Sequence, residues 1–374
     1  MSVRVAINGF GRIGRLAFRI ALLNYSDKLD IVAVNTSGSM DVEGWAHLVK
    51  YDTTYRKFPR EITFEKIRSA NEATDETPEI GKIMVNSDSI GAGGKTTLVL
   101  AQRDPEKLPW KKLGVEIVIE ATGVFTDEEG AKKHAKAGAK RVVISAPAKG
   151  GNVNTYVIGV NDYNTEAEVL SNASCTTNCV APVAAVMHSK FGIEKAMITT
   201  AHAYTDDQNT QDNSHHDLRR ARAAAENIVP TTTGAALAVT ETIPELKGIF
   251  DGAALRVPVI TGSITDFTFL LKKDVTVDEV NNAFREAVKL PNYQGILAVE
   301  DEELVSSDII GRTESAIVDL KFTQVVAGNM VKVFAWYDNE WGYAHRLIEQ
   351  VIRVGNSLRT TVAPTDPITK QFSI

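Results

Sequence analysis

The chain has 374 residues, of which 44% are apolar and 24% charged, and its formal net charge is −6. This length predicts two domains with sizeable cores, and the acidic balance argues against sequence-independent binding of nucleic acid or membranes. No apolar run approaches the roughly 20 residues of a membrane span. The first residues, MSVRVAINGF, enter a strand at once without a signal-peptide pattern, so we expect a cytoplasmic protein.

Strand and helix signals alternate along the first half of the chain. Apolar runs predict strands over residues 3–9, 29–35, 115–122 and 140–147. Helical signals mark residues 15–24 and 127–139. This βαβ order predicts a doubly wound α/β domain with a parallel sheet. Residues 62–100 are turn-rich and predict short strands with exposed loops; we interpret GAGGKTT in this region as a hairpin loop, because it lacks the full spacing of a phosphate-binding loop.

Strand signals dominate the second half. The predicted strands cover residues 196–205, 254–260, 264–273, 315–325 and 330–338. The predicted helices cover residues 180–193, 276–288 and 344–358. We therefore expect an α+β domain built on a largely antiparallel sheet. The last residues hold two prolines and little pattern, and they predict a surface tail.

A glycine motif follows the first predicted strand and opens the first helix. It reads Gly9-Phe10-Gly11-Arg12-Ile13-Gly14, a GxGxxG in the context that a dinucleotide-binding site requires. Gly9 permits the tight turn, Gly11 lets the backbone approach a pyrophosphate, and Gly14 lets helix and strand pack closely. The phosphates would then lie against the positive end of the helix.

The second predicted strand lacks the acid that usually binds the adenosine ribose of NAD. It ends in Asn35, Thr36 and Ser37. The two hydroxyls could donate to a 2′-phosphate, and no negative charge would repel it. Residue chemistry therefore favours NADP, with the alternative that Thr36 merely caps the strand.

The two cysteines, Cys175 and Cys179, lie in the short motif CTTNC. Two thiols exclude a disulfide framework and make a poor zinc site. Cys175 lies nearest the expected helix start, where a thiolate is stabilised, whereas Cys179 is expected to pack among apolar residues. The candidate bases are His202 and His215, with Asp206, Asp207 and His216 nearby. A reactive thiol beside a nicotinamide would give a thiohemiacetal, then a thioester.

Two groups of arginines are candidate anion sites. Arg219, Arg220 and Arg222 form a basic cluster that we interpret mainly as a solvated face. Arg256 instead lies inside an apolar strand signal, ALRVP, and suits an anionic ligand.

Several motifs together resemble one enzyme family. They are, in chain order, INGFGRIGR, KYDT, SNASCTTNC, HAYTDDQ, DLRRARAAA, PTTTGAA, RVP and WYDNEWGY. The combination resembles the phosphorylating glyceraldehyde-3-phosphate dehydrogenases, from residue 3 to about residue 355. The resemblance implies a Rossmann domain over residues 1–174, completed by a helix over 340–355. It also implies a catalytic domain over 175–339 and a tail over 356–374.

The resemblance also implies residue roles. Cys175 would be the nucleophile, with His202 as its base and ion-pair partner. Thr205 and Arg256 would hold the substrate phosphate. Inorganic phosphate would bind near Ser174, Thr176, Thr233 and Gly234. The implied cofactor contacts are Gly9, Phe10, Gly11, Arg12, Ile13, Asn35, Thr122, Gly123, Asn339, which would orient the carboxamide, and Tyr343.

Departures from the family pattern bear on the cofactor. NAD-specific members usually carry Asn-Asp where this chain has Asn35-Thr36, and Leu-Pro where it has Asn213-Ser214. NADP-accepting relatives carry small or polar residues at both places, and their equivalent of Ser214 reaches the 2′-phosphate of a neighbouring subunit's cofactor. Arg103 is expected to add charge near the adenine. We therefore expect NADP as cofactor, with NAD possible.

Other departures concern neither thiol nor base. Leu237 and His216 replace common lysines, and the loops in 66–96 and the tail exceed the usual length. The tail has no cysteine, which excludes a disulfide-switched tail. The family implies a homotetramer that acts on a small molecule and inorganic phosphate, with no nucleic-acid or membrane partner.

Two alternative functions remain open at this point. One is an erythrose-4-phosphate dehydrogenase, which shares SNASCTTNC but usually departs around HAYT and PTTTGAA. The other is a non-catalytic dinucleotide-binding protein, which could lose the thiol or the base, whereas this chain has both Cys175 and His202.

Overall fold

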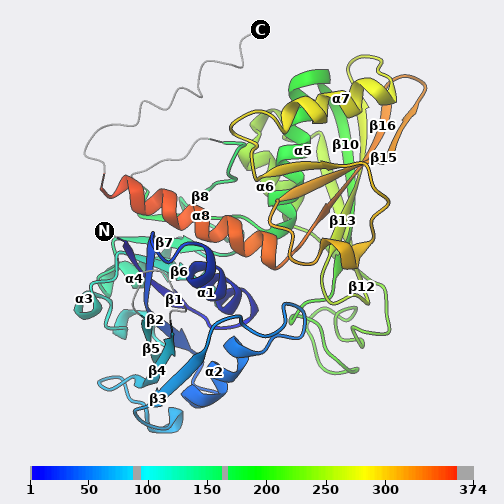
Figure 1. Ribbon diagram of the computed structural model, residues 1–374. Coiled ribbons are helices and arrows are strands. Elements are labelled where there is room, and N and C mark those ends of the chain that lie inside the picture. Colours follow the sequence, from blue (N-terminus) through cyan, green and yellow to red (C-terminus); the bar gives the residue numbers. More distant parts are fainter. Residues whose placement is uncertain (1, 87–93, 162–166, 360–374) are drawn as a thin grey trace. The chain divides into compact units, whose positions relative to one another are not determined.

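The computed structural model describes residues 2–86, 94–161 and 167–359, and it divides into two compact units (Figure 1). Unit 1 comprises Met1–Thr155, Asn164–Asn172 and Ala344–Ser357. Unit 2 comprises Tyr156–Tyr163, Ala173–Tyr343 and Leu358–Ile374. The predicted tail lies almost entirely outside the described residues.

A largely parallel sheet forms the centre of unit 1. Its described strands run in the order β3-β4-β5-β2-β1-β6-β7-β9-β8. Among the strand pairs that the structure describes in this sheet, only β3–β4 and β4–β5 are antiparallel. Their bounds are β1 Val3–Asn8, β2 Leu29–Thr36, β3 Ile62–Lys66, β4 Glu79–Val85, β5 Lys95–Ala101, β6 Ile117–Glu120, β7 Arg141–Ile144, β8 Asn154–Thr155 and β9 Val169–Ser171. The doubly wound parallel sheet predicted for the first half is confirmed.

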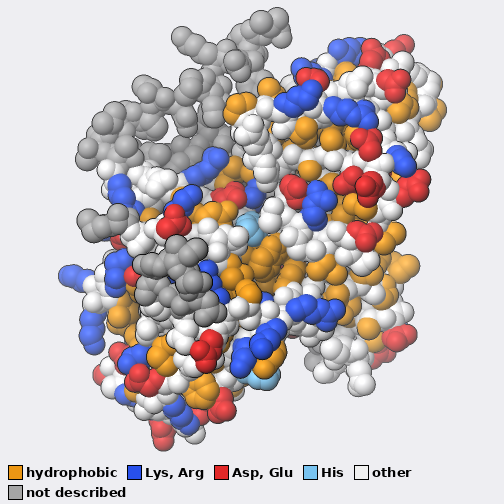
Figure 2. Space-filling view, in the orientation of Figure 1, with side chains coloured by type: hydrophobic (Ala, Val, Ile, Leu, Met, Phe, Trp, Pro, Cys, Tyr) orange, Lys and Arg blue, Asp and Glu red, His pale blue; other side chains and the backbone are white. Residues whose placement is uncertain are grey.

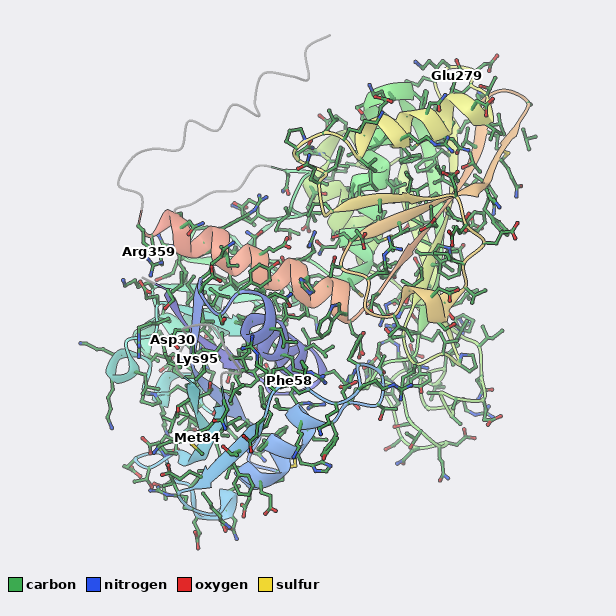
Figure 3. The ribbon with its side chains drawn as sticks, viewed as in Figure 1. Asp30, Phe58, Met84, Lys95, Glu279 and Arg359 are labelled. Atoms are coloured by element: carbon green, nitrogen blue, oxygen red, sulfur yellow. The ribbon has the colours of Figure 1, made fainter. Side chains whose placement is uncertain are left out.

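Strands β4 and β5 are antiparallel neighbours, with Val85 opposite Lys95. Of the GAGGKTT segment that was predicted as a hairpin loop, residues 95–97 belong to strand β5 and residues 91–93 lie outside the described part of the chain. Lys95 also forms an ion pair of 3.8 Å with Asp30 of the neighbouring strand β2 (Figure 3).

Helices connect the strands of unit 1. The described ones are α1 Arg12–Asn24, α2 Val42–Lys50, α3 Trp110–Leu113, α4 Glu128–Lys136 and most of α8 Trp341–Ser357, with single turns at Ala70–Glu72 and Pro105–Lys107. Asp127 caps α4 through a 2.6 Å hydrogen bond from the amide of Gly130. The sequence analysis assigned no element to α2, which is short and contains Gly44.

Two predicted strands of unit 1 are too long at their C-terminal ends. The strand predicted over 115–122 ends in the structure at Glu120, the last residue of β6. The carboxylate of Glu120 accepts the amide of Thr122 at 2.8 Å, and Gly123 has a φ of +73°. These two features turn the chain out of the sheet. The prediction over 140–147 likewise contracts to β7.

Unit 2 is built on a mixed sheet that is mainly antiparallel. Its described strands run in the order β11-β12-β10-β13-β16-β15-β14. Within the described part of this sheet, parallel pairs occur only at β10–β12 and β14–β15. The bounds are β10 Ile193–Ala203, β11 Val229–Thr232, β12 Phe250–Val257, β13 Ser263–Leu271, β14 Leu297–Glu300, β15 Ala316–Val326 and β16 Met330–Tyr337. The predicted α+β domain is confirmed.

Two helices of unit 2, α5 and α7, pack on one face of this sheet (Figure 1). The described helices are α5 Cys175–Phe191, α6 Ala235–Thr242 and α7 Val277–Ala287, with single turns at Pro244–Leu246 and Ser306–Ile309. Cys179 is fully buried in the core that α5 forms, so its predicted packing role is confirmed. At the start of α7, the N-cap residue Thr276 forms a capping box with Glu279, which is labelled in Figure 3.

The described surface shown in Figure 2 carries Lys and Arg side chains interspersed with Asp and Glu. Among the described residues, no helix combines the length and apolar character needed to cross a membrane.

Candidate active site

Cys175 is the first residue of α5, at the end of a tight turn. Ser174 caps the helix, because its Oγ accepts the amide of Thr177 at 3.0 Å. Before it, Ala173 has a φ of +58°, a strained conformation for a residue with a Cβ. Its carbonyl accepts a 3.0 Å hydrogen bond from the hydroxyl of Tyr343. The turn therefore presents the thiol at the positive end of a long helix.

The structure pairs this thiol with His202 of β10. The distance from Nε2 of His202 to Sγ of Cys175 is 3.3 Å. On the other side of the ring, Nδ1 lies 2.7 Å from the carbonyl oxygen of Ala203 and contacts the guanidinium of Arg256. His215, the other candidate base, instead contacts Asp217. Of the two candidates, only His202 reaches the thiol.

Burial and charge oppose each other at this pair. Burial raises the pKa of the Cys175 thiol, while the positive charge of Arg256 and hydrogen bonds from Thr176 act to lower it. Burial and the same Arg256 charge lower the pKa of His202 to about 3, against a smaller effect of the Ala203 hydrogen bond. Burial therefore opposes the ion pair that the resemblance implies, and Arg256 favours the thiolate but not the imidazolium.

Tyr337 is a site residue that the sequence analysis did not single out. It is 1% exposed, and its hydroxyl lies 2.9 Å from Oγ1 of Thr176. Its ring is edge-on to that of His202, with centroids 6.1 Å apart. Its place in the WYDNEWGY motif was the only available signal.

The other predicted phosphate residues lie on three segments of unit 2. Arg256 is the register partner of His202 across β10 and β12, and Thr205 follows the end of β10. Gly234 is the N-cap residue that precedes α6, and Thr233 Oγ1 accepts the amide of Ala235 at 3.1 Å. Within the described residues, Thr233 and Gly234 make no direct hydrogen bond to the thiol or its base. Leu237, on the same helix, is 66% exposed.

Asn339 is held in one orientation. Its Oδ1 accepts hydrogen bonds from the amide of Gly262 at 3.1 Å and from the hydroxyls of Ser263 and Thr261 at 2.9 and 3.3 Å. The side chain is 4% exposed. These hydrogen bonds occupy the oxygen of the Asn339 side chain and leave its amide nitrogen as the donor. Tyr343, by contrast, uses its hydroxyl to hold the backbone before Cys175.

The glycine turn of unit 1 fits a dinucleotide. Gly9 has a φ of +97°, and a Cβ on Gly14 would lie 2.0 Å from the carbonyl oxygen of Gly9. A Cβ on Gly11 would meet nothing within 4 Å, and no side chain caps the start of α1. The open backbone and the uncapped helix start are the features that receive a pyrophosphate. Phe10 is 2% exposed and packs on Trp45, so its side chain belongs to the core.

Arg12, predicted to line the pyrophosphate, is tethered to the KYDT motif. Its Nη1 lies 2.5 Å from Oδ2 of Asp52. Burial would raise the pKa of Asp52, but amide hydrogen bonds from Tyr55 and Thr54 and the charge of Arg12 outweigh burial and hold it below its usual value. The KYDT motif was recognised in the sequence, but no role was predicted for Asp52. Ile13 lies in the same first turn, partly exposed.

The end of β2 requires a correction to the predicted role of Thr36. This residue is 3% exposed, and its hydroxyl donates to the carbonyl of Leu100 at 2.9 Å. Its proton is therefore used inside the protein, and its oxygen accepts the amide of Gly38 at 3.3 Å. Ser37 and Arg103 are exposed and line a cavity of about 330 Å³ beside this strand end.

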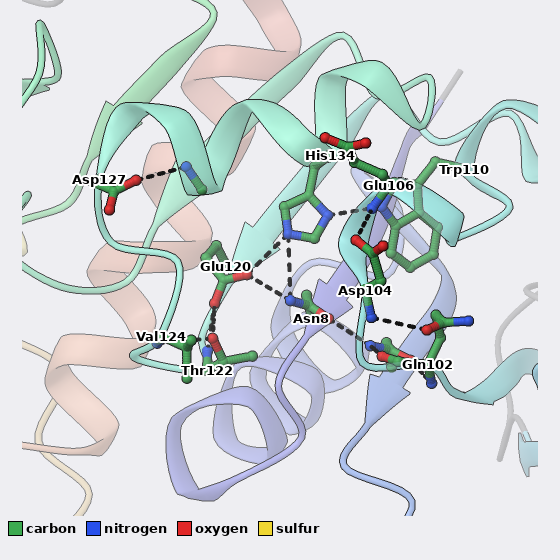
Figure 4. A network of polar contacts seen from close by, with 12 residues as sticks. Asn8, Gln102, Asp104, Glu106, Trp110, Glu120, Thr122, Val124, Asp127 and His134 are labelled. Carbon is green, nitrogen blue, oxygen red and sulfur yellow. Dashed lines mark hydrogen bonds and ion pairs between the residues drawn. The ribbon is translucent and has the colours of Figure 1, made fainter. Parts of the chain in front are cut away.

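The remaining predicted cofactor residues are exposed or buried as follows. Thr122, labelled in Figure 4, and Gly123 are exposed in the turn after β6, and Asn35 is buried at the end of β2. Ser214 is exposed on a loop of unit 2, where its amide donates to Oδ1 of Asn213 at 2.7 Å.

Comparison with known families agrees with both units. The glyceraldehyde 3-phosphate dehydrogenase NAD-binding domain matches residues 3–79 and 72–128, and the C-terminal domain of the same family matches residues 174–339. The glyceraldehyde-3-phosphate dehydrogenase of Streptomyces coelicolor is 49% identical over 361 residues, covering 96% of this chain and all of the relative.

Relatives from other lineages match over nearly the same span. The glyceraldehyde-3-phosphate dehydrogenase of Geobacillus stearothermophilus is 49% identical, covering 93% of this chain and 97% of its own length. The chloroplastic glyceraldehyde-3-phosphate dehydrogenase A of Chlamydomonas reinhardtii is 48% identical, covering 93% and 87%. This chain therefore belongs to the glyceraldehyde-3-phosphate dehydrogenase family, and it is an oxidoreductase with a Rossmann NAD(P)-binding domain and a separate catalytic domain.

Proposed function

We propose that this enzyme converts glyceraldehyde 3-phosphate and inorganic phosphate to 1,3-bisphosphoglycerate through a thioester on Cys175. The observation that supports this reaction is the 3.3 Å approach of His202 Nε2 to the sulfur at the start of α5. A thiol, a base and a helix N-terminus together form the arrangement of a cysteine nucleophile. Arg256, which contacts the same imidazole, supplies a cation for the phosphate of the substrate.

Cys175 begins the reaction when its S–H proton passes to His202 and the sulfur bonds to the aldehyde carbon; His202 then gives the proton to the carbonyl oxygen, which yields a thiohemiacetal. His202 accepts the proton of that hydroxyl as the carbon loses its hydrogen as a hydride and becomes a thioester. The bound dinucleotide supplies the hydride acceptor. An oxygen of inorganic phosphate then attacks the thioester carbon, the carbon–sulfur bond breaks, and Cys175 leaves as the thiolate.

Phosphate binding is assigned to two groups of residues. Arg256 and Thr205 would hold the phosphate of the substrate, because a guanidinium suits that anion. Inorganic phosphate would use Ser174, Thr176, Thr233 and Gly234. The start of α6, at Gly234, adds the positive end of an eight-residue helix.

The dinucleotide would bind along the edge of the Rossmann sheet. Gly9, Gly11 and the start of α1 would receive the pyrophosphate, with Arg12 and Ile13 beside it, and Thr122 and Gly123 would line the cleft. Asn339 would donate its amide to the carboxamide, with Tyr343 nearby. The Rossmann domain would then span residues 1–174 and 340–355, and the catalytic domain residues 175–339.

We infer a preference for NADP from the surroundings of β2. The strand ends without a carboxylate, and Ser37 and Arg103 line the adjacent cavity. Asp75 also lines this cavity, but its charge is paired with Lys107. Within the described residues Arg103 forms no ion pair, so its charge is available to a 2′-phosphate. Thr36 contributes by lacking a charge and not by donating its proton. In a homotetramer Ser214 of one subunit would add a hydroxyl to the 2′-phosphate bound by a neighbour.

Kinetics and mass spectrometry test the proposal together. With aldehyde and oxidised dinucleotide but no phosphate, we expect one burst of reduced dinucleotide and an acyl adduct on Cys175. Adding phosphate should restore turnover. Steady turnover without phosphate, or an adduct elsewhere, would contradict the mechanism, and an equal or higher kcat/KM with NAD than with NADP would contradict the cofactor preference.

A further inference from the structure

A buried polar network joins the ends of four neighbouring strands of unit 1 (Figure 4). The strands are β5, β2, β1 and β6, and all four run parallel. Ligands of doubly wound sheets bind outside these carboxyl ends. The network is therefore placed directly beneath the edge where the dinucleotide binds.

The carboxylate of Glu120, the last residue of β6, is the centre of the network. Its Oε1 accepts the amide of Thr122 at 2.8 Å and also the hydroxyl of the same residue. Its Oε2 accepts Nδ2 of Asn8 at 2.6 Å and Nε2 of His134 at 2.9 Å. Glu120, Asn8 and His134 are each at most 1% exposed. A carboxylate can accept all four hydrogen bonds, but an amide cannot.

His134 can donate to Glu120 because a tryptophan fixes its tautomer. The indole Nε1 of Trp110 donates to Nδ1 of His134 at 3.0 Å. Because indole nitrogen is only a donor, Nδ1 must be the acceptor, which puts the ring proton on Nε2. That proton points at Glu120. The direction of every hydrogen bond from Trp110 to Glu120 is thereby determined.

The network continues through two asparagines to the adenosine side of the sheet. Oδ1 of Asn8 accepts Nδ2 of Asn35 at 2.7 Å. Asn35 also pairs with the backbone of Gln102, whose amide donates at 3.0 Å and whose carbonyl accepts at 2.8 Å. Gln102 directly precedes Arg103. Two buried amides thus connect Glu120 to the segment that carries Arg103.

Through its other oxygen, Glu120 fixes the conformation of the turn after β6, which packs against the glycine loop. It holds Thr122 by two hydrogen bonds, and the Thr122 hydroxyl in turn accepts the amide of Val124 at 3.1 Å. A Cβ on Gly9 would lie 2.6 Å from the backbone nitrogen of Thr122. The turn after β6 and the turn after β1 therefore touch backbone to backbone. A shift of Thr122 would displace the loop that receives the pyrophosphate.

We propose that Glu120 and His134 are positioning residues for dinucleotide binding, which act without touching the ligand by holding the ends of β6, β1, β2 and β5 in register. Their role is to keep the glycine loop, the Thr122 turn and the Arg103 segment at one fixed spacing. This inference depends on the NAD(P)-binding domain and not on the proposed preference for NADP.

Glu120→Gln is the direct test, because it changes one atom and the charge. In one orientation the amide nitrogen introduced at position 120 would face Nδ2 of Asn8 and Nε2–H of His134, and in the other it would face the backbone amide of Thr122, so donor would meet donor in either case. We expect the dissociation constants of NAD and NADP, measured by titration calorimetry, to rise by about fivefold or more, the lower range for a buried donor left unpaired. Both nucleotides should weaken by a similar factor, because they share the pyrophosphate.

A charge swap tests whether the pairing itself matters. In the double variant Asn8→Asp/Glu120→Gln, the new carboxylate can accept from the amide introduced at position 120 and from Nδ2 of Asn35. Nε2 of His134 lies 3.4 Å from Nδ2 of Asn8, the atom that a carboxylate oxygen replaces in this variant, so His134 can donate there as well. We expect the swap to recover most of the lost affinity. Trp110→Phe, which removes only the donor to Nδ1, should weaken both nucleotides less than Glu120→Gln does.

Asp319→Asn is the matched control. Asp319 is a carboxylate in unit 2 that is 3% exposed and accepts the indole of Trp336 at 3.2 Å. Its neutralisation should lower the melting temperature without changing either dissociation constant. A Glu120→Gln protein that melts earlier but binds both nucleotides as tightly as wild type would overturn the proposal, since the role would then be structural. The proposal would also be overturned if the double variant bound the nucleotides no more tightly than Glu120→Gln. If Glu120→Gln does not fold, wild-type dissociation constants in Trp110→Phe would overturn it.

Discussion

Nε2 of His202 lies 3.3 Å from Sγ of Cys175, although 27 residues separate them in the chain. One residue begins a helix and the other lies next to the end of a strand. The imidazole is 4% exposed and its other nitrogen contacts Arg256. The base is therefore held between the nucleophile and the cation, so the charge on Arg256 acts on both.

Replacing His202 should slow the chemical step far more than binding. We expect His202→Asn to lower kcat by roughly 10²–10⁴-fold, the usual contribution of a positioned general base, with little change in the KM for aldehyde. Steady-state kinetics would measure this split. His215→Asn is the matched control, because His215 contacts Asp217 instead of the thiol, and it should retain nearly full activity. Comparable decreases in kcat in the two variants would contradict the role of His202 as the base.

Replacing Arg256 should move two pKa values upward together. Its charge lowers the pKa of both Cys175 and His202, so Arg256→Gln should raise both. The rate of alkylation of Cys175 by iodoacetamide should then fall at neutral pH and need a higher pH to recover. Arg222→Gln is the control, because Arg222 is paired with Asp212 at the surface. An unchanged pH profile for Arg256→Gln would show that the two groups do not feel this charge.

Sequence patterns predicted the two fold classes, because periodicity is a local signal. The helix predicted over 180–193 in fact begins five residues earlier, at Cys175, because Ser174 caps it through the amide of Thr177, and this polar first turn carries no apolar periodicity. The sequence patterns left two candidate bases open, since the choice between His202 and His215 depends on which one β10 carries to the thiol. The role of Thr36 could not be read either. Its hydroxyl donates to Leu100, a partner 64 residues away that the sheet brings beside it. The Glu120 network was invisible for the same reason.

The preference for NADP should depend on Arg103. We expect Arg103→Gln to lower kcat/KM for NADP by roughly ten- to a hundredfold, the range of a hydrogen bond to a charged group, and to change kcat/KM for NAD little. Thr36→Val is the matched variant. Because the Thr36 proton bonds inside the protein, this change should cost about 1 kcal/mol of stability and leave the NADP/NAD ratio unchanged. Equal losses with both cofactors in Arg103→Gln would place Arg103 away from the 2′-phosphate.

Two buried histidines should make the protein sensitive to acid. The pKa of His202 is lowered to about 3 and that of His345 to about 4, in both cases chiefly by burial. Between these values and the ordinary 6.5, the unfolded chain binds protons that the folded chain does not. The free energy of unfolding therefore falls as pH falls below about 6.5, by at most about 1.4 kcal/mol per pH unit for each histidine.

Urea unfolding at a series of pH values would measure this loss, and His345→Gln should flatten the dependence between pH 6.5 and 4. His47→Gln, at an exposed position, should keep the wild-type slope. A His345→Gln protein with the same slope as wild type would show that this histidine titrates alike in the folded and unfolded chain.

Replacing Gly14 or Gly11 by alanine adds the same methyl group but should affect stability differently. A Cβ on Gly14 would lie 2.0 Å from the carbonyl oxygen of Gly9, so Gly14→Ala must displace α1 from the loop and should cost about 1–3 kcal/mol of stability. A Cβ on Gly11 meets no protein atom within 4 Å, and the φ of −72° at this position suits alanine. Gly11→Ala should therefore keep the wild-type unfolding midpoint.

The same methyl group on Gly11 would occupy the space through which the pyrophosphate approaches the backbone. We expect the dissociation constants of NAD and NADP to rise in Gly11→Ala without any loss of stability, as titration calorimetry and urea unfolding on the same sample would show. Wild-type affinity in Gly11→Ala would mean that the phosphates lie elsewhere along the sheet edge. Wild-type stability in Gly14→Ala would mean that α1 can move away from β1 at little cost.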